Sequence, residues 1–250
     1  MAFIVSMSVP GVRPFRDAGP VARHDLVAEI RRRLAAAGNP ERARAQQAYM
    51  KSAMPFHGIS APELRVLLRP VLDDPAYRIE GRREWEATVR ELWDGATHRE
   101  ERYAAIALTE HRAYRPWQDP EALALYAHMV RTGAWWDLVD VIASDRVGLI
   151  LLCAPDEVAP VVRQWARGDD LWLRRTAILS QIKARARTDT TLLRECIEPN
   201  LADPSFWIRK AIGWALRSYA RTDPDWVRAE VDRWGEGLSG LSRREALKHL

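Results

Sequence analysis

The sequence predicts an all-α fold, an α-solenoid of stacked helix pairs, and three observations lead to it. Apolar residues recur at spacings of three and four, as in Leu64, Leu67 and Leu68, which is the period of a helix with one buried face. Alternating, strand-like runs between turn residues are missing from the sequence. Short stretches also repeat after 34 or 35 residues, a period typical of HEAT-like or TPR-like arrays. Such an array has a concave face lined by the second helix of each pair.

Capping residues mark where the successive helices start. Side chains that cap a helix precede a proline at Asn39-Pro40, Asp119-Pro120 and Asp223-Pro224. The capping-box pattern, a serine or threonine followed three residues later by glutamate, occurs at Ser60–Glu63, Thr97–Glu100 and Ser242–Glu245. Together with the helical spacing, these signals predict about eleven or twelve helices joined by short loops.

The repeat is clearest in the second half of the chain. Trp172-Leu173-Arg174-Arg175 is followed 35 residues later by Trp207-Ile208-Arg209-Lys210. Ala186-Arg187-Thr188-Asp189 is followed 34 residues later by Ala220-Arg221-Thr222-Asp223. Trp172 and Trp207 are therefore expected to occupy equivalent places and to anchor one repeat against the next.

One domain is expected over residues 24–250, preceded by a disordered or loosely attached tail at residues 1–23, where Pro10, Gly11 and Pro14 lie. No apolar run reaches the roughly 18 residues that span a membrane, and no basic residue precedes the apolar N-terminal run, so neither a membrane segment nor a secretory signal is expected. Cys153 and Cys196 both lie in apolar helical contexts, which fits buried thiols in a reducing cytoplasm.

Composition and motif searches narrow the chemistry. The net charge of +4 and pI of about 9.3 are compatible with nucleic-acid binding. The sequence has no glycine-rich phosphate loop, no Gly-x-Ser-x-Gly elbow and no convincing Cys/His pair. Its six histidines do not have the spacing of a zinc site. We therefore expect neither a metal nor a cofactor.

Trp136 and Asp140 form the most informative pair in the sequence. Residues four apart share one face of a helix, so an indole and a carboxylate would stand side by side. That pair suits a substrate that becomes cationic, since the ring face and the carboxylate both attract positive charge. The same spacing also fits a packed tryptophan beside a surface aspartate. Trp135, about 100° round the helix from Trp136, is expected in the core.

Several segments resemble the AlkD-like family of DNA alkylation repair glycosylases, in order from about residue 24 to residue 250. The matching stretches are Tyr49-Met50-Lys51, Phe56-His57-Gly58-Ile59-Ser60-Ala61-Pro62-Glu63-Leu64-Arg65, Glu91-Leu92-Trp93, Trp135–Asp140, Trp172–Leu179, Ile208–Arg217 and Leu241–His249. The resemblance implies a HEAT-like fold that removes positively charged N3- and N7-alkylated purines from duplex DNA without enclosing the base in a pocket.

The resemblance also implies site residues. It assigns Asp140 as the catalytic carboxylate, Trp136 and Trp214 as aromatic walls beside the sugar, and Arg175 as the arginine between carboxylate and phosphate. Asp140 paired with Arg175 for structure alone, and Trp214 as a core residue, are the alternatives. Further cations are candidates for contacts to DNA phosphates, each of which also fits an ordinary solvated charge: Arg65, Arg209, Lys210, Arg217, Arg243, Arg244 and Lys248.

The leading hypothesis is thus a monomeric cytoplasmic glycosylase that acts at the bacterial nucleoid on double-stranded DNA containing alkylated purines, possible bulky adducts included. One alternative is a catalytically silent HEAT-repeat protein that binds bent or branched DNA. Another is a HEAT-type scaffold for protein partners, which would explain the repeats but not the clustered Trp, Arg and Asp. Self-protection in a producer of DNA-alkylating compounds is a further hypothesis, since the Ala/Arg-rich composition is typical of a GC-rich genome.

Overall fold

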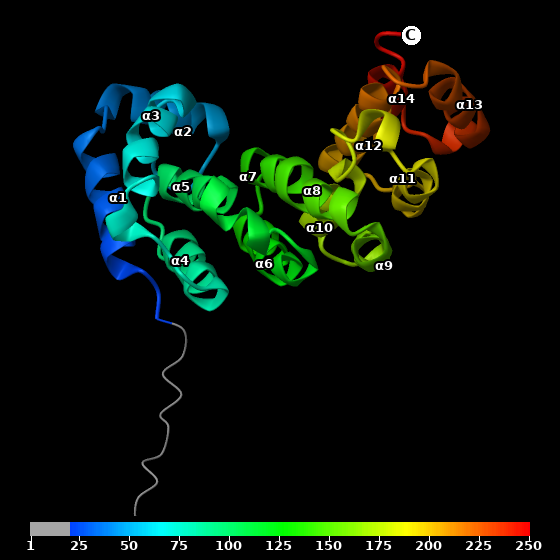
Figure 1. Ribbon diagram of the computed structural model, residues 1–250. Coiled ribbons are helices and arrows are strands. Elements are labelled where there is room, and N and C mark those ends of the chain that lie inside the picture. The colour runs from blue at the N-terminus through cyan, green and yellow to red at the C-terminus, as the bar shows by residue number, and fades with distance from the viewer. Residues whose placement is uncertain (1–20) are drawn as a thin grey trace, which may run out of the picture.

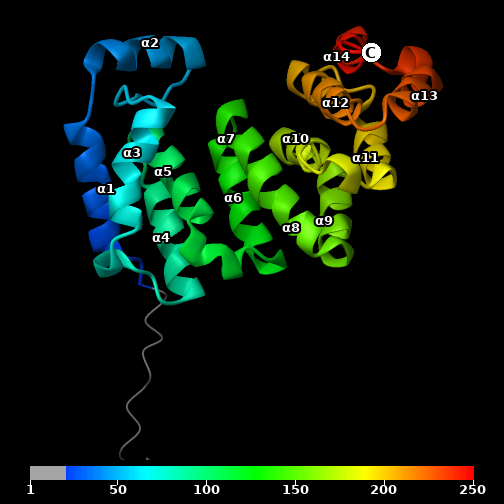
Figure 2. The ribbon, with the colours of Figure 1, turned by 45° about the horizontal axis from the view of Figure 1, so that its top comes forward.

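The computed structural model describes residues 21–250, and within that range the chain has 14 α-helices and no strand. The prediction of an all-α fold is confirmed. The helices follow one another along an arc, from α1–α3 at one end to α12–α14 at the other, with α7 near the middle (Figures 1 and 2). Their bounds are α1 His24–Ala36, α2 Pro40–Met50, α3 Ala61–Leu72, α4 Arg82–Asp94, α5 Arg99–Glu110, α6 Leu123–Gly133, α7 Trp136–Val141, α8 Gly148–Cys153, α9 Pro155–Arg167, α10 Leu171–Leu179, α11 Thr190–Ile197, α12 Phe206–Tyr219, α13 Pro224–Trp234 and α14 Gly240–Ala246.

The helix count exceeds the expected eleven or twelve partly because one long helix is divided. A π-helical segment at Ile142–Val147 joins α7 directly to α8, so residues 136–153 form one continuous helix. Hydrophobic spacing does not reveal such a segment, because the hydrogen-bond pattern changes while the helix continues. π-helical turns are rare and occur frequently at functional sites.

The repeat appears as equivalent positions in successive helix pairs. Trp172 and Trp207 are the second residues of α10 and α12, and their ring centroids lie 5.6 Å apart. Asp189 and Asp223 are the N-caps of α11 and α13. Helix α10 packs against α9 on one side and α12 on the other. The predicted packing anchors are thus confirmed, and the architecture is that of an α-solenoid-like helical repeat.

Three of the predicted caps are confirmed. Asn39 accepts a hydrogen bond from the Arg42 amide at 3.0 Å, the Glu63 carboxylate accepts one from the Ser60 amide at 2.8 Å, and Asp223 accepts one from the Trp226 amide at 2.9 Å. Asp119 also caps, but it precedes a 3-10 turn rather than an α-helix.

Two predicted capping boxes are wrong. The box before α5 uses His98 and Glu101, one residue later than expected. Glu100 is instead fully buried and accepts hydrogen bonds from the amides of residues 57–59, which holds that loop against α5. In α14 the N-cap is Ser239, and Ser242 lies inside the helix. The Glu245 side chain is thereby free for contacts with α12.

The chain is anchored from Arg23 onward. The Arg23 amide donates to the Thr88 hydroxyl at 2.9 Å, and its guanidinium donates to the Arg78 carbonyl at 2.9 Å. Residues 1–20 of the predicted tail lie outside the described residues.

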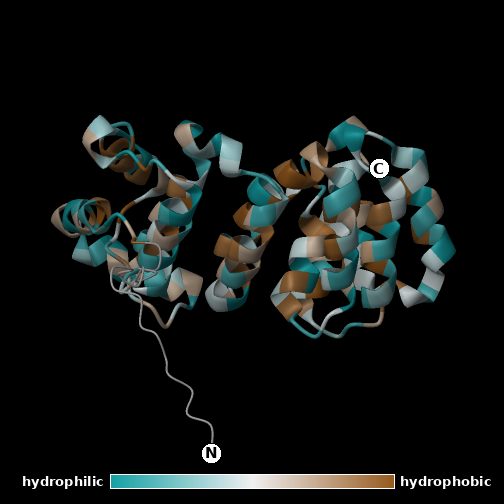
Figure 3. Cartoon of the chain, turned by 60° about the horizontal axis from the view of Figure 1, so that its bottom comes forward, coloured by the Kyte–Doolittle hydropathy of each residue, from teal (hydrophilic) through white to brown (hydrophobic). Residues whose placement is uncertain are grey.

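The core runs the whole length of the arc as one apolar cluster. Polar and apolar residues alternate along the helices, as amphipathic helices require (Figure 3). Trp85 and Trp93 are completely buried, whereas Cys153 is exposed, contrary to expectation; Cys196 is buried and both thiols are free. Among the helices of residues 21–250, none combines the length and the hydrophobicity that a membrane span requires.

Candidate active site

Asp140 and Arg175 form a bidentate ion pair between α7 and α10. The Arg175 guanidinium donates through Nε to Oδ1 at 2.7 Å and through Nη2 to Oδ2 at 2.8 Å. Its Nη1 donates to the Trp207 carbonyl of α12 at 2.6 Å. The Arg175 side chain is 3% exposed and that of Asp140 12% exposed. This fork geometry fixes the orientation of a carboxylate that solvent still reaches.

Burial raises the pKa of Asp140 above its ordinary value, and the hydrogen bonds and charge of Arg175 oppose that rise. The negative charge of nearby Asp137 raises the pKa of Asp140 further. Asp140 is therefore a carboxylate that has lost most of its water and depends on one guanidinium. In such an environment its charge acts strongly on a cation brought close to it.

The two candidate aromatic walls are half-buried, so neither is a fully buried core residue. Trp136 is the first residue of α7 and shares a helix face with Asp140. Trp214 lies on α12, where it lines a small polar cavity with Arg217 and Lys248. Helix α10, which carries Arg175, packs between α7 and α12. The structure brings Asp140 and Arg175 into contact and places the two indoles on the helices to either side.

A network that the sequence did not reveal ties α7 to α5. The Arg99 guanidinium, almost fully buried, donates through Nε to the Asp137 carboxylate at 3.2 Å and through Nη2 to its other oxygen. The Tyr103 hydroxyl donates to the same carboxylate, and burial raises its pKa. Asp137 sits between Trp136 and Asp140 in the chain, so this network holds the helix that carries both.

Trp135 was expected in the core, and the structure does not place it there. It is half-buried and packs its ring 5.3 Å from Trp207 and 6.2 Å from Trp172, measured between centroids. The Arg175 guanidinium lies 5.8 Å from the Trp207 ring. The expectation failed because Trp135 is the N-cap of α7, with extended backbone, so its direction does not follow the helical period. The rings of Trp135, Trp172 and Trp207 therefore form one cluster, which the Arg175 guanidinium approaches at Trp207.

The predicted phosphate-contacting cations divide into two groups. Four have internal partners: Lys210 and Arg217 both pair with Glu245, Arg209 donates to the Asp203 carbonyl at 2.8 Å, and Arg243 donates to the Gly235 carbonyl at 2.7 Å. Arg65, Arg244 and Lys248 are exposed, and within residues 21–250 their side chains make no ion pair. Their roles at DNA stay predictions.

One cluster in the described part of the chain has the composition of a metal site: His57, His98 and Glu101. The imidazole rings stack with centroids 3.8 Å apart, and burial lowers the pKa of His57. Glu101 already accepts from the Arg31 guanidinium at 2.8 Å and from the Thr97 hydroxyl at 2.7 Å. These contacts identify Glu101 as a helix-capping and ion-paired residue, and the absence of a metal requirement stays a prediction.

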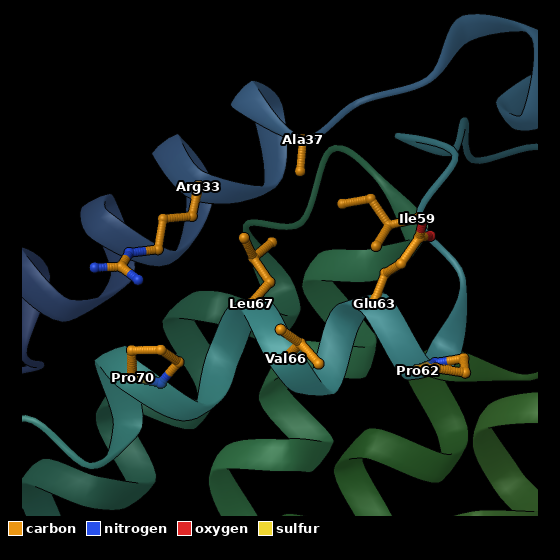
Figure 4. Close-up of a pocket in the computed structure, with 8 residues that line it drawn as sticks. All are labelled: Arg33, Ala37, Ile59, Pro62, Glu63, Val66, Leu67 and Pro70. Carbon is orange, nitrogen blue, oxygen red and sulfur yellow. The ribbon is translucent and has the colours of Figure 1, made fainter.

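Two larger depressions lie in the N-terminal half. One, of about 480 Å³, is a mostly apolar hollow between α1 and α3 that contains none of the candidate residues (Figure 4). The other, of about 720 Å³, is a groove between α2, α3, α5 and the continuous helix that begins at α7. Asp137, Val141 and Arg65 line it. One side of the groove is therefore formed by the helix that carries Asp140.

Both the sequence and the fold are similar to those of known proteins. The sequence model of a family described as DNA alkylation repair enzyme matches residues 30–250. Among solved structures, the chain is similar to one described as "Predicted DNA alkylation repair enzyme from Enterococcus faecalis", with 31% identity and a TM-score of 0.73. That similarity covers 85% of this chain and 96% of the other. The sequence has no match among curated proteins.

Proposed function

The chain belongs to the DNA alkylation repair enzyme family, since the family match spans residues 30–250, and on that premise we propose that it is a monofunctional DNA glycosylase. Its substrates are positively charged N3- and N7-alkylated purines in duplex DNA. It hydrolyses the N-glycosidic bond of the damaged nucleotide and leaves an abasic site.

The proposed chemistry needs a single carboxylate. Ordinary glycoside hydrolysis uses one carboxyl group to protonate the leaving group and a second on the opposite side of the sugar. An alkylated cationic purine departs as a neutral base, so no acid is needed. As the bond breaks, positive charge moves onto the deoxyribose, and Asp140 stabilises it by about 4 kcal/mol at 4 Å with an effective dielectric constant of 20. If confined to the transition state, this is roughly a thousandfold in rate.

The neighbouring side chains assist that carboxylate. The faces of Trp136 and Trp214 would each add about 0.5–2 kcal/mol of cation–π stabilisation to the charged sugar. Arg175 keeps both Asp140 oxygens in a fixed direction and, with the backbone phosphate of the bound DNA nearby, sets the register of the strand.

The observation that carries the proposal is the solvent-accessible, fork-held carboxylate of Asp140 on the same helix face as Trp136. A silent DNA-binding relative would need the cations but not this carboxylate. Such a relative would use the Asp140–Arg175 pair only to hold α7 against α10, so release of the damaged base distinguishes the two functions.

The test is release of N7-methylguanine from methylated duplex DNA. Asp140→Asn should lose most of the release, by about a thousandfold, while its affinity for unmodified duplex stays close to that of the unaltered protein. Asp225→Asn, the same change at an exposed residue of α13, serves as control and should release normally. Thermal melting of each variant shows whether the fold persists. Unimpaired release by a folded Asp140→Asn would remove Asp140 from its proposed role.

A further inference from the structure

A small cavity of about 300 Å³ lies where the C-terminal half of α12 meets the residues that follow α14. The two helices pack together at the C-terminal end of the arc (Figures 1 and 2). The cavity is lined by Trp214, Arg217, Ser218, Arg221, Lys248 and His249. One of the proposed aromatic walls of the active site is thus also a wall of this cavity.

The cavity lining is cationic and contains no carboxylate. Three of its six residues carry a permanent positive charge: Arg217, Arg221 and Lys248. Arg221 and Lys248 are exposed, and within residues 21–250 neither side chain forms an ion pair or hydrogen bond. Two uncompensated cations beside a concave surface form a site for an anion.

Glu245 determines where this free charge lies. Its carboxylate accepts from the Lys210 ammonium at 2.6 Å and from the Arg217 guanidinium, on the two sides of Trp214 along α12. The hydrogen bond from Lys210 is the main cause that lowers the pKa of Glu245. Glu245 shares one negative charge between Lys210 and Arg217, so the region keeps a net positive charge. Arg221 and Lys248 make no ion pair within residues 21–250 and are the cations left to meet a ligand.

We infer that this cavity binds one phosphodiester group of duplex DNA, through Arg221 and Lys248, and that seating it sets the distance between the sugar and the Trp214 indole. The inference rests on the proposed function, in which Trp214 faces the damaged nucleotide. Residues 210, 214 and 217 follow one stripe of α12, and Arg221 lies in the turn just after the helix, so a strand lying along the stripe would meet the indole and the cavity in succession. A phosphodiester carries one negative charge and two free oxygens, which matches two donor cations.

Binding of a short fluorescent, unmodified duplex at several salt concentrations tests the inference. Arg221→Gln and Lys248→Gln should each weaken binding by about threefold to thirtyfold at moderate salt. Each should also reduce the slope of log affinity against log salt by about one. Arg228→Gln, which removes an exposed, ion-paired charge from α13, is the matched control and should bind normally. Unchanged affinity and slope in both cavity variants would overturn the inference.

A scan with single neutral methylphosphonates then locates the phosphate. At one position, the methylphosphonate should weaken binding of the unaltered protein and cause a smaller loss in Arg221→Gln, because one of the two contacts to that phosphate is already missing. Additive losses at every position would show that the arginine acts only through its general field, and would contradict a defined pocket. These measurements use undamaged DNA, so their failure is distinct from a failure of base release.

Discussion

At residue 140, burial and an arginine act in opposite directions on one carboxyl group. Burial raises the pKa of Asp140, and only the ionised form can stabilise a cationic sugar. As the pH falls through this raised pKa, base release should decline, so the acid limb should lie above the ordinary aspartate value of about 3.9. Over this acid range the alkylated purine keeps its positive charge, so its ionisation does not contribute to the limb. Release rates measured across pH, corrected for spontaneous depurination, give the position of the limb.

Arg175→Gln tests whether this arginine controls the ionisation of Asp140. Removing the guanidinium removes the hydrogen bonds and the charge that lower the pKa of Asp140. The rate of base release should therefore fall, and its acid limb should move to higher pH. A lower rate with the limb unmoved would mean that Arg175 acts on the DNA and not on the ionisation of Asp140.

At the scale of elements, the contact between α12 and α14 depends on the missing side chain of Gly213. A Cβ atom there would lie 2.5 Å from the Glu245 Cβ and 3.0 Å from the Ser242 carbonyl oxygen. Gly213→Ala should therefore destabilise the protein by about 1–3 kcal/mol, although alanine favours a helix by up to about 1 kcal/mol. Thermal melting should show a drop of roughly 2–8 °C.

Gly237→Ala is the matched control for that substitution. Gly237 belongs to the same C-terminal region, and a Cβ there would meet nothing within 4 Å. The Gly237→Ala variant should therefore melt at the same temperature as the unaltered protein. If Gly213→Ala melted like Gly237→Ala, the close approach of α14 to α12 would not be a constraint on the fold.

These elements also show how far the sequence predicts the structure. Helical spacing, proline-associated caps and the repeated tryptophans predicted an all-α array and the equivalent places of Trp172 and Trp207. The Asp140–Arg175 pair was expected only through the resemblance to AlkD-like glycosylases, and the structure contains it. The role of Glu245 was not, because Ser242–Glu245 fits a local capping box, whereas a glycine on another helix brings Glu245 to Lys210. Local sequence patterns predict partners within one helix, whereas contacts between helices depend on how the helices pack together.

At the scale of the whole molecule, the proposed catalytic pair lies between two unlike surfaces. Toward the N-terminus is the apolar groove of about 720 Å³, and toward the C-terminus is the cationic cavity beside Trp214. DNA held by its phosphates at the C-terminal end would leave the groove open to any group attached to the damaged base. Under the proposed function the damaged base is not enclosed, so the size of the adduct is limited only by the groove.

The groove therefore predicts that bulky cationic adducts are excised as well as methyl lesions, which is the property that self-protection would require. Ala107 is a half-buried groove residue of α5, one turn from Tyr103. In Ala107→Phe the larger side chain should fill part of the groove. Release of a bulky N3-adenine adduct should then slow by about tenfold or more, because one misplaced apolar group is worth about 1–3 kcal/mol. Release of N7-methylguanine should change little. Time courses with both substrates measure the ratio. Equal slowing of both would mean that the substitution displaces α7 and Asp140, and that the groove takes no part in substrate choice.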